Sequence, residues 1–460
     1  MIGSSRIILT ELHESDVSVD YLQTLNDSEY MKYSRNSNFI HTQSSQIQYI
    51  ANFRLSNNLL FAIKNTENKK LLGSINCYID FSKMTLDLGF LIFKNQQGKG
   101  YASEALELLI PYLEAQYPGM TAVIGSNKSN YAMHEIAKKF SFRIESDGHQ
   151  NTDPNLRFTR VFPRLNPVSP PVVPDFILKA KRIGVAAYDA GGAEQISWLL
   201  RNLPTKALAY IDGPANRIFE NSRITFDRAG QLSDVMSCDL VITGSGWMSQ
   251  LEVNAIKEAQ QRGIPCLTIL DHWVNYLERF DSNKMNLPQI LAVTNSVALQ
   301  MAQEKFPNKL VWLLPDFQVE NYQKRMRQSE KTSSCALILL EPTSTLSSMF
   351  AVSDSVIEEL LKSAIMHKRA RGLSAVIVRP HPSQLGYPLL EHKLKEFPDE
   401  MKISDASSLL EDLENSAVVF GLNSYAMYIS SQCEIVTHSY FKGKIGHWTN
   451  YFPKILDVDI

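Results

Sequence analysis

The segment Gln97-Gly98-Lys99-Gly100-Tyr101-Ala102 combines small residues with the expected start of a helix. Glycine lets a backbone approach a ligand closely, and the first amides of a helix lack partners, so such a turn suits a pyrophosphate group. Short glycine motifs also occur by chance, and a strand-to-helix turn without a ligand is the alternative. The turn is therefore the first candidate binding site.

The spacing of apolar residues has a period of two before this turn and a period of three or four after it. Residues 85–93 alternate between apolar and polar side chains, which predicts a strand, and apolar residues then recur at helical spacing. His134 is expected on a helix surface and Cys77 in the core. The residues before the proline-rich boundary thus form an α+β domain, with strands at 59–63, 71–79 and 85–93 and helices through 102–113 and 132–140.

Three segments, in this order, resemble the GNAT N-acetyltransferases of the ribosomal-protein and amino-sugar branch. The pattern carried by Gln97, Gly100 and Ala102 is similar to the acetyl-CoA loop of the family. Residues 86–92 look like its fourth strand, and residues 130–142 resemble its Asn-x-x-Ser…Glu-Lys-x-Gly-Phe segment. The resemblance covers most of residues 1–160 and implies acetyl-CoA as co-substrate.

The resemblance also assigns roles to individual residues, although Met133 stands where serine is usual and Ser141 where glycine is usual. Asp87 would act as the base that deprotonates the acceptor amine, or else is an ordinary solvent-facing strand residue. Tyr131 or Tyr101 would protonate the departing thiolate. The residues expected to hold acetyl-CoA are Phe90, Leu91, Ile92, Gln97, Gly98, Lys99, Gly100, Tyr101, Ala102 and Asn130.

Five prolines between residues 162 and 176 mark a domain boundary. Because proline fixes φ and removes a backbone donor, we expect this stretch to join no helix or central strand and to form a semi-stiff linker. A second, weaker boundary is expected in the polar segment 317–334. The expected units are an N-terminal domain (1–161), a linker (162–179), a first lobe (180–320) and a second lobe (321–460).

After the linker, short apolar strands alternate with helices in two successive runs. This alternation predicts α/β architecture with two Rossmann-like lobes that face a cleft. Ligands bind at the carboxyl ends of parallel strands, where the first lobe carries three polar clusters. The clusters are Asp189 with Glu194, Thr243-Gly244-Ser245-Gly246-Trp247, and residues 271–276 with His272.

Two of the three clusters have an alternative interpretation. Asp189 and Glu194 would act on a sugar hydroxyl, or Glu194 would only interact with its helix dipole. His272 and its neighbour Trp273 would line a sugar pocket, or they would simply pack against other side chains.

Two turns of the second lobe carry groups suited to phosphate. The turn Arg379-Pro380-His381-Pro382 offers a guanidinium for phosphate. The turn Gly421-Leu422-Asn423-Ser424 opens a helix. Asn423 and Ser424 would either cap this helix or leave its first amides free for phosphate. The two turns resemble the donor lobe of GT-B glycosyltransferases. The two-lobe architecture resembles that of the UDP-sugar hydrolases and epimerases of nonulosonic acid synthesis. The resemblance implies a UDP- or CMP-type nucleotide sugar, bound without a metal by His272, Arg379, His381, Asn423 and Ser424.

Composition excludes several other classes of protein. The 46 basic and 48 acidic side chains give a net charge of −2, so there is no global basic field for nucleic acid. No apolar run approaches the roughly 20 residues of a membrane span. Five scattered cysteines form no C-x-x-C pair, which predicts a reduced, cytoplasmic protein without structural zinc.

Together these patterns predict a bifunctional enzyme of surface-glycan synthesis. The N-terminal domain would N-acetylate an amino sugar, free or nucleotide-linked, and the two lobes would bind a nucleotide sugar and transfer or release the sugar. Peripheral association with glycan-assembly machinery is a further expectation. In the alternative, the N-terminal domain acetylates a protein N-terminus or lysine, and the lobes are a non-catalytic module that binds glycan or nucleotide.

Overall fold

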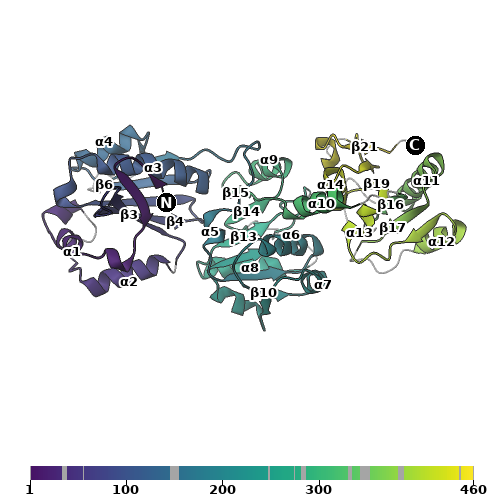
Figure 1. The fold of residues 1–460 in the computed structure, drawn as a ribbon, viewed down its shortest axis with the longest axis horizontal. Helices are drawn as coiled ribbons and strands as arrows, with labels where there is room; N and C mark the ends of the chain where they lie inside the picture. The colour runs from purple at the N-terminus through teal and green to yellow at the C-terminus, as the bar shows by residue number, and fades with distance from the viewer. Residues whose placement is uncertain are drawn as a thin grey trace.

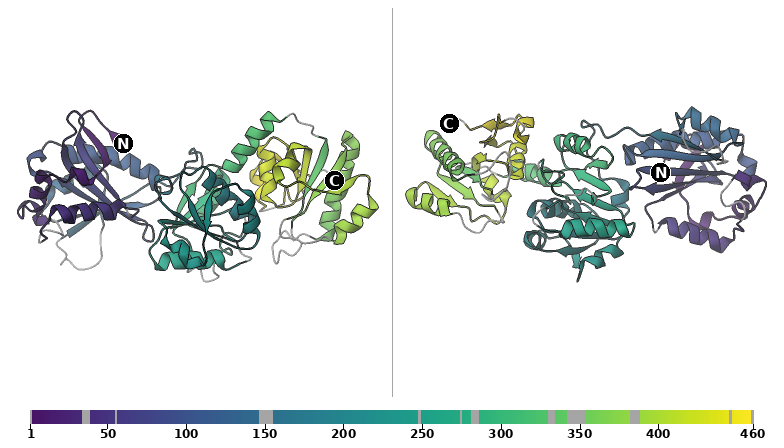
Figure 2. Two further views of the ribbon diagram at one scale, coloured as in Figure 1. Left: turned by 60° about the horizontal axis from the view of Figure 1, so that its bottom comes forward. Right: turned by 180° about the vertical axis from the view of Figure 1, so that it is seen from behind.

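Three β-sheets follow one another along the chain in the computed structural model. They lie in a row, with the N-terminal domain at one end and the second lobe at the other (Figures 1 and 2). Trp247 and Pro382, which belong to two of the predicted turns, lie outside the described residues. The structure describes residues 2–33, 39–54, 56–145, 155–246, 249–273, 275–280, 286–329, 334–341, 353–381, 388–444 and 447–458.

The N-terminal sheet has the order β1-β2-β3-β4-β5-β6-β8-β7. Neighbouring strands pair antiparallel except β5 and β6, which run parallel. The predicted strands at 59–63, 71–79 and 85–93 are confirmed as β3, β4 and β5. The strands are β1 (Ile2–Gly3), β2 (Ile7–Glu11), β3 (Leu59–Asn65), β4 (Leu71–Asp80), β5 (Thr85–Ile92), β6 (Thr121–Asn127), β7 (Arg143–Ile144) and β8 (Asn155–Val161).

Helices cover both faces of this sheet (Figure 1). Helices α1 (Val19–Leu25) and α2 (Gln43–Arg54) pack on one face through a cluster that includes Tyr21 and Phe53. Helices α3 (Tyr101–Gln116) and α4 (Tyr131–Lys139) belong to the core of the other face. The short turns are η1 (Glu14–Asp16), η2 (Tyr30–Tyr33) and η3 (Lys94–Gln96).

One buried residue of this domain contradicts its prediction and another confirms it. His134 is buried rather than on a helix surface, because its Nε2 lies 3.0 Å from the Asn127 carbonyl and its ring packs against Phe158. Cys77 is fully buried, as expected of a small apolar side chain.

The proline-rich segment ends in one helical turn, α5 (Asp175–Leu178). The prediction that the segment joins no helix is wrong at this end. Pro174 precedes the first helical residue, where its fixed φ and missing amide cost nothing. Phe176 and Ile177 of this turn are buried.

The N-terminal domain and the first lobe share one apolar core. The ring of Phe176 lies between Phe81 of the domain and Trp312 of the lobe, with centroid distances of 5.7 and 6.4 Å. The Tyr112 hydroxyl of α3 donates to Asp175 at 2.8 Å, and the Val172 amide donates to the carbonyl of Leu313 at 3.1 Å. Because buried residues on both sides form one cluster, the segment is a packed connection.

The first lobe is a fully parallel sheet with the order β11-β10-β9-β12-β13-β14-β15. Its strands are β9 (Ile183–Ala187), β10 (Ala207–Ile211), β11 (Phe226–Arg228), β12 (Leu240–Thr243), β13 (Cys266–Ile269), β14 (Ile290–Val293) and β15 (Leu310–Leu313). Its helices are α6 (Ala190–Arg201), α7 (Pro214–Asn221), η4 (Leu232–Ser237), α8 (Leu251–Gln261) and α9 (Ser296–Lys305).

The second lobe repeats this topology with the parallel order β18-β17-β16-β19-β20-β21. Its strands are β16 (Cys335–Leu339), β17 (Ala375–Arg379), β18 (Met401–Ile403), β19 (Ser416–Gly421), β20 (Val436–Ser439) and β21 (Ile455–Asp457). Its helices are α11 (Asp354–Arg371), α12 (Pro388–Glu396), α13 (Leu409–Glu414), α14 (Tyr425–Gln432) and η5 (Trp448–Tyr451).

Both lobes therefore have the strand order of a doubly wound Rossmann sheet, with a switch point beside the first strand of each. The polar segment predicted as a break between them forms α10 (Phe317–Gln328), which runs through the expected boundary at residues 320 and 321. Among the helices of the described ranges, none has the length and apolar character needed to cross a membrane.

Candidate functional site

Strands β5 and β6 separate inside the N-terminal sheet. Their parallel ladder pairs Thr85, Leu86 and Asp87 with residues 121–123 and stops there. Strand β5 continues to Ile92, and β6 runs on to Asn127, about 13 Å farther at 3.3 Å per residue. The strands thus border an open wedge whose narrow end is at Asp87. Phe90, Leu91 and Ile92, which are predicted to hold acetyl-CoA, lie along one side of it.

The glycine-containing turn lies between the end of β5 and the start of α3. Gly98 and Gly100 have φ values of +71° and +84°, a conformation that favours glycine, and Gly100 is the N-cap of α3. Within the described residues, the amides of residues 98–102 donate no hydrogen bond to a backbone carbonyl. The turn therefore has the unpaired donors and the close backbone access that a diphosphate requires.

Tyr30 also contacts this turn, although no sequence pattern singled it out. Its hydroxyl donates to the Ile92 carbonyl, and it is hydrogen-bonded to the Gln97 side chain. Burial raises the pKa of the Tyr30 hydroxyl. The Ile92 carbonyl is thus already engaged by Tyr30, whereas the backbone of Phe90 and Leu91 lies closer to the narrow end of the wedge along β5.

Asp87 lies on the face of the sheet that α2 covers. It pairs directly with Tyr78 of β4, and a Cβ at Gly89 would lie 2.3 Å from Asn76 Oδ1, so these positions share one face. Asn76 Nδ2 donates to the Tyr49 hydroxyl of α2 at 3.1 Å. This side of the wedge therefore presents neutral polar groups around one carboxylate.

The predicted residues of α4 lie toward the wide end of the wedge. Asn130 caps α4, and its Oδ1 accepts from the Met133 amide at 3.3 Å. Tyr131 is 73% exposed, and its ring meets the edge of the His134 ring at a centroid distance of 5.9 Å. The structure thus gives Asn130 a capping bond and leaves the Tyr131 hydroxyl mostly in solvent.

Two carboxylates lie against glycines at the switch point of the first lobe. A Cβ at Gly191 would lie 2.0 Å from Asp271 Oδ2, and one at Gly246 would lie 2.4 Å from Asp189 Oδ2. Asp271 forms an ion pair with Arg279 at 2.5 Å. Gly191 and Gly246 therefore leave room for the protein's own carboxylates.

Glu252 is a buried carboxyl at the same edge that the sequence did not single out. Its Oε1 accepts from the Tyr188 amide at 2.7 Å, and only 1% of the residue is exposed. Burial, reinforced by the negative charge of Asp189, raises the pKa of Glu252 to about 7. Glu252 thus holds the backbone that leads into Asp189.

Glu194 of the first lobe and Arg379 of the second lobe interact electrostatically. Burial raises the pKa of Glu194 on α6, and the charges of Arg201 and Arg379 oppose that shift. Arg379 ends β17 in the second lobe, so its charge acts on Glu194 from the opposite side. The carboxylate and the guanidinium predicted in separate turns therefore lie within range of each other's charge.

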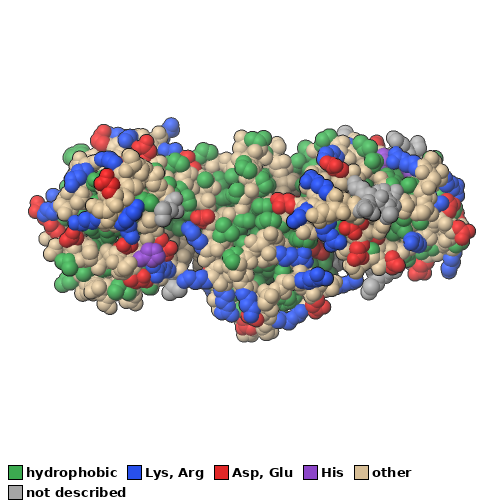
Figure 3. Space-filling model, in the orientation of Figure 1, with side chains coloured by type: hydrophobic (Ala, Val, Ile, Leu, Met, Phe, Trp, Pro, Cys, Tyr) green, Lys and Arg blue, Asp and Glu red, His purple; other side chains and the backbone are tan. Residues whose placement is uncertain are grey.

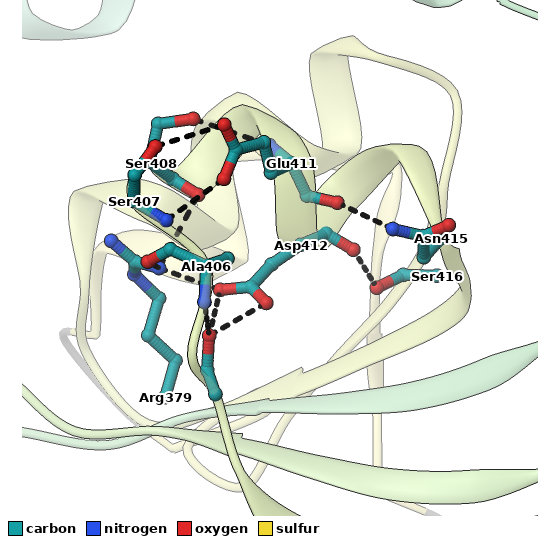
Figure 4. Close-up of polar contacts among 9 residues, drawn as sticks. Arg379, Ala406, Ser407, Ser408, Glu411, Asp412, Asn415 and Ser416 are labelled. Atoms are coloured by element: carbon teal, nitrogen blue, oxygen red, sulfur yellow. Dashed lines mark hydrogen bonds and ion pairs between the residues drawn. The ribbon is translucent and has the colours of Figure 1, made fainter.

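Arg379 is held by the protein itself (Figure 4). Its Nη1 binds Asp412 Oδ2 at 2.6 Å and also donates to the carbonyls of Ala406 and Ser408 at 3.4 and 3.3 Å. Ser404 Oγ also donates to the Asp412 carboxylate. Among the described residues, the hydrogen-bond partners of Arg379 all contact Nη1, which leaves Nε and Nη2 for an anion.

His272 and Asn423 join the two lobes. His272 Nε2 lies 2.6 Å from the Asn423 carbonyl, and its Nδ1 accepts from the Trp273 amide at 3.0 Å. This pattern requires a neutral ring with the proton on Nε2, and burial lowers the pKa of His272 to about 4. Asn423 also accepts from the Trp448 indole at 2.5 Å, and its amide donates to Glu341 at 2.5 Å.

Aromatic side chains fill the contact around this bond. Trp273 is 3% exposed and stacks on Trp448 with a centroid distance of 4.3 Å. The packing alternative therefore describes Trp273 better than an open sugar pocket does. Ser424 caps α14 through the Ala426 amide at 3.2 Å, and burial lowers the pKa of His381. The ligand roles of Ser424 and His381 remain predictions.

Charged side chains of both signs are spread over the surface. Figure 3 shows Lys and Arg together with Asp and Glu along the length of the face in view, consistent with the net charge of −2. Within the part of the chain that the structure describes, no three His, Cys, Asp or Glu side chains form a group that could hold a metal ion.

Comparison with known proteins identifies the first domain. Residues 6–143 match the family model described as an acetyltransferase (GNAT) domain. The uncharacterized N-acetyltransferase YnaD of Bacillus subtilis (strain 168) is 26% identical over 144 residues, which cover 31% of this chain and 83% of the relative. The chain therefore carries a GNAT acetyltransferase domain at its N-terminus, and acetyl-CoA is consistent with it as co-substrate.

Several solved structures resemble about a third of this chain. Spermidine N-acetyltransferase from Vibrio cholerae in complex with CoA and spermine is 14% identical, covers 35% of this chain and 97% of its own, and has a TM-score of 0.31. A GNAT-family acetyltransferase from Bacillus anthracis is 19% identical with the same coverages and TM-score. The microcin C7 self-immunity acetyltransferase MccE, in complex with acetyl-CoA and AMP, is 19% identical, covers 34% and 93%, and has a TM-score of 0.30.

Proposed function

We propose that the chain N-acetylates the amine of an amino sugar with acetyl-CoA, and that its two lobes hold a nucleotide sugar for glycosyl transfer or sugar release. The observation that carries the first half is the opening between β5 and β6, which leads to a turn with unpaired amides. Two features that would hold different parts of acetyl-CoA thus lie on consecutive elements of a GNAT domain.

Acetyl-CoA would supply an activated acetyl thioester, and the chain would position it. The amides of residues 98–102 would bind the diphosphate, and the backbone of Phe90 and Leu91 would pair with the pantetheine arm. The amine must lose a proton before it can attack, and Asp87, at the narrow end of the wedge, is the proposed base, directly or through water. Tyr131 remains the proposed proton donor to the thiolate.

The acceptor is proposed to enter from the α2 side of the sheet. Tyr49, Asn76 and Tyr78 provide neutral hydrogen-bonding groups there, which suit sugar hydroxyls. Asp87 provides a carboxylate on the same face of the sheet.

A nucleotide sugar is proposed to bind between the two lobes. The Nε and Nη2 groups of Arg379 support a phosphate contact, and the charge of Arg379 opposes the rise in the pKa of Glu194 in the first lobe. His272, His381, Asn423 and Ser424 remain the proposed neighbours of the ligand. The five cysteines are all unpaired, which supports the proposed cytoplasmic location.

A protein N-terminus or lysine is the second candidate acceptor. It is favoured by exposed apolar side chains near α1 and α2, where Val19, Phe39 and Ile40 are 69%, 59% and 79% exposed. A peptide would cover such side chains, whereas a sugar would not. In this case the two lobes would serve as a module that binds glycan or nucleotide.

The test supplies acetyl-CoA with UDP- or CMP-linked amino sugars, free amino sugars, or peptides with a free N-terminus, and measures the release of free CoA. Mass spectrometry of the acceptor then identifies the acetylated amine. Release with a sugar but not with peptides supports the main proposal, and the reverse supports the second candidate. Absence of thiol release with every amine from a folded chain would contradict acetyl transfer.

A further inference from the structure

We propose that Arg6 is a positioning residue that clamps the pyrophosphate loop, here defined as residues 97–104, from the turn between β1 and β2. The importance of this loop rests on the proposed function, but the clamp itself can be tested in the ligand-free protein. The sequence did not single out Arg6, because it lies more than ninety positions away from the residues that it contacts.

Arg6 contacts the loop at three points. Its Nη1 donates to the Lys99 carbonyl at 3.2 Å, and its Nη2 forms an ion pair with Glu104. Its guanidinium also lies over the ring of Tyr101, 5.2 Å from the centroid. Ser4, in the same turn, donates through Oγ to Glu104 Oε1 at 2.5 Å. The β1–β2 turn thus holds both the loop and the first turn of α3.

Other side chains contact the two ends of the loop: Tyr30 is hydrogen-bonded to the Gln97 side chain, and Lys139 Nζ donates to Ser103 Oγ at 2.9 Å. Residues 97–100 are exposed, and a Cβ at Gly98 would have no heavy atom within 4 Å. Glycine gains the most backbone freedom when it is not held, so an unsupported loop with two glycines would sample many conformations. Arg6 binds the Lys99 carbonyl and the Glu104 carboxylate, on either side of Gly100, and so restricts that freedom before the ligand arrives.

The charges favour a clamp over a direct phosphate contact. Glu104 lies in the first turn of α3, where its charge would repel a nearby diphosphate if Arg6 did not neutralise it. The planar guanidinium binds a carbonyl and a carboxylate together, which the single ammonium of lysine does less well. Arg6→Lys therefore separates the two roles: it keeps the positive charge but loses the geometry.

The experiment uses the full chain with Arg6→Ala, Arg6→Lys and Glu104→Gln. Arg54→Ala is the matched control, because Arg54 binds Glu11 and Glu14 on the α2 side of the domain and not on the loop. Hydrogen exchange in the ligand-free protein reports on the first turn of α3, whose first bond joins the Glu104 amide to the Gly100 carbonyl at 3.0 Å. Calorimetry reports Kd for acetyl-CoA and for acetyl-3′-dephospho-CoA.

We expect faster exchange in this turn for Arg6→Ala and Arg6→Lys, and no change for Arg54→Ala. Kd should rise about tenfold for both Arg6 variants, the effect of losing one charge-assisted hydrogen bond. The rise should be equal for both coenzymes, because a positioning residue does not touch the 3′-phosphate. Glu104→Gln should have a smaller effect, since the Lys99 bond remains.

Several results would overturn the clamp. Exchange in Arg6→Ala identical to that of the wild type would show that the loop does not depend on Arg6. A Kd for Arg6→Lys equal to that of the wild type, or a loss seen only with the 3′-phosphorylated coenzyme, would assign Arg6 to direct charge attraction. If the wild type bound neither coenzyme, the proposed function would fail, while the exchange result would still decide the clamp.

Discussion

Asp87 of β5 and Val123 of β6 form the last pair of the parallel ladder in the N-terminal sheet. Beyond this pair the two strands have no mutual backbone pairing, so the carboxylate lies where the sheet begins to open. A base at this point would be close to a thioester inserted between the strands, and its side chain shares a face with Tyr78 on the α2 side. This placement favours a catalytic role for Asp87 over that of an ordinary strand residue.

Asp87→Asn should lower kcat for acetyl transfer at least a hundredfold, because general base catalysis contributes about 10²- to 10⁴-fold. The Kd for acetyl-CoA should stay within about twofold, since the carboxylate is not expected to hold the coenzyme. CoA release and calorimetry measure the two quantities. Asp80→Asn, which alters the turn after β4, is the control, and an Asp87→Asn enzyme of near wild-type rate would exclude this base.

Gly100→Ala should weaken acetyl-CoA binding about tenfold, because an L-residue at φ +84° costs roughly 1–2 kcal/mol. The strain would push the N-cap of α3 out of the conformation that exposes its amides. Gly119→Ala is the matched control, since Gly119 has φ +79° in the same domain but lies outside the loop. Equal coenzyme affinity in the two variants, measured by calorimetry, would refute a special role for the turn.

Arg379→Ala should destabilise the second lobe by about 3–5 kcal/mol, the usual cost of leaving a buried carboxylate without its partner. The Asp412 side chain is only 6% exposed, so water cannot replace the guanidinium. The double variant Arg379→Ala with Asp412→Asn should recover most of this loss in chemical denaturation. If the double variant were as unstable as the single one, Asp412 would not be the group that Arg379 compensates.

Acid should weaken the contact between the lobes through His272. Its pKa is lowered from 6.5 to about 4 in the folded chain, so between these values the unfolded chain binds more protons. The contribution of His272 to stability should therefore be fully present above about pH 6.5 and should be lost as the pH decreases toward 4. The fluorescence of the stacked Trp273 and Trp448 during denaturation follows this loss, which should be smaller in His272→Asn. An equally steep pH dependence in both proteins would assign it to another group.

Much of the architecture could be predicted because it depends on local patterns. The alternation in residues 85–93 and the helical spacing after Ala102 identify β5 and α3, and repeated strand–helix alternation predicts two parallel sheets. The polar composition of residues 317–328 concealed α10, because a helix that bridges two lobes needs few apolar positions.

The missed features depend on contacts between distant residues. No local pattern indicates that Arg6 reaches Lys99, that Asp412 engages Arg379, or that Trp273 stacks on Trp448. The candidate loop was predictable because its glycines act through their own backbone. The groups that surround it were not, since folding alone brings them together.

The aromatic contact of Phe176 with Phe81 and Trp312 limits how this chain can be divided. A cut among the prolines would leave Phe176 with the first lobe and would uncover apolar surface on both products. A recombinant acetyltransferase fragment should therefore extend through Leu178, and a chimera built with a foreign first lobe would require matching side chains opposite Phe81.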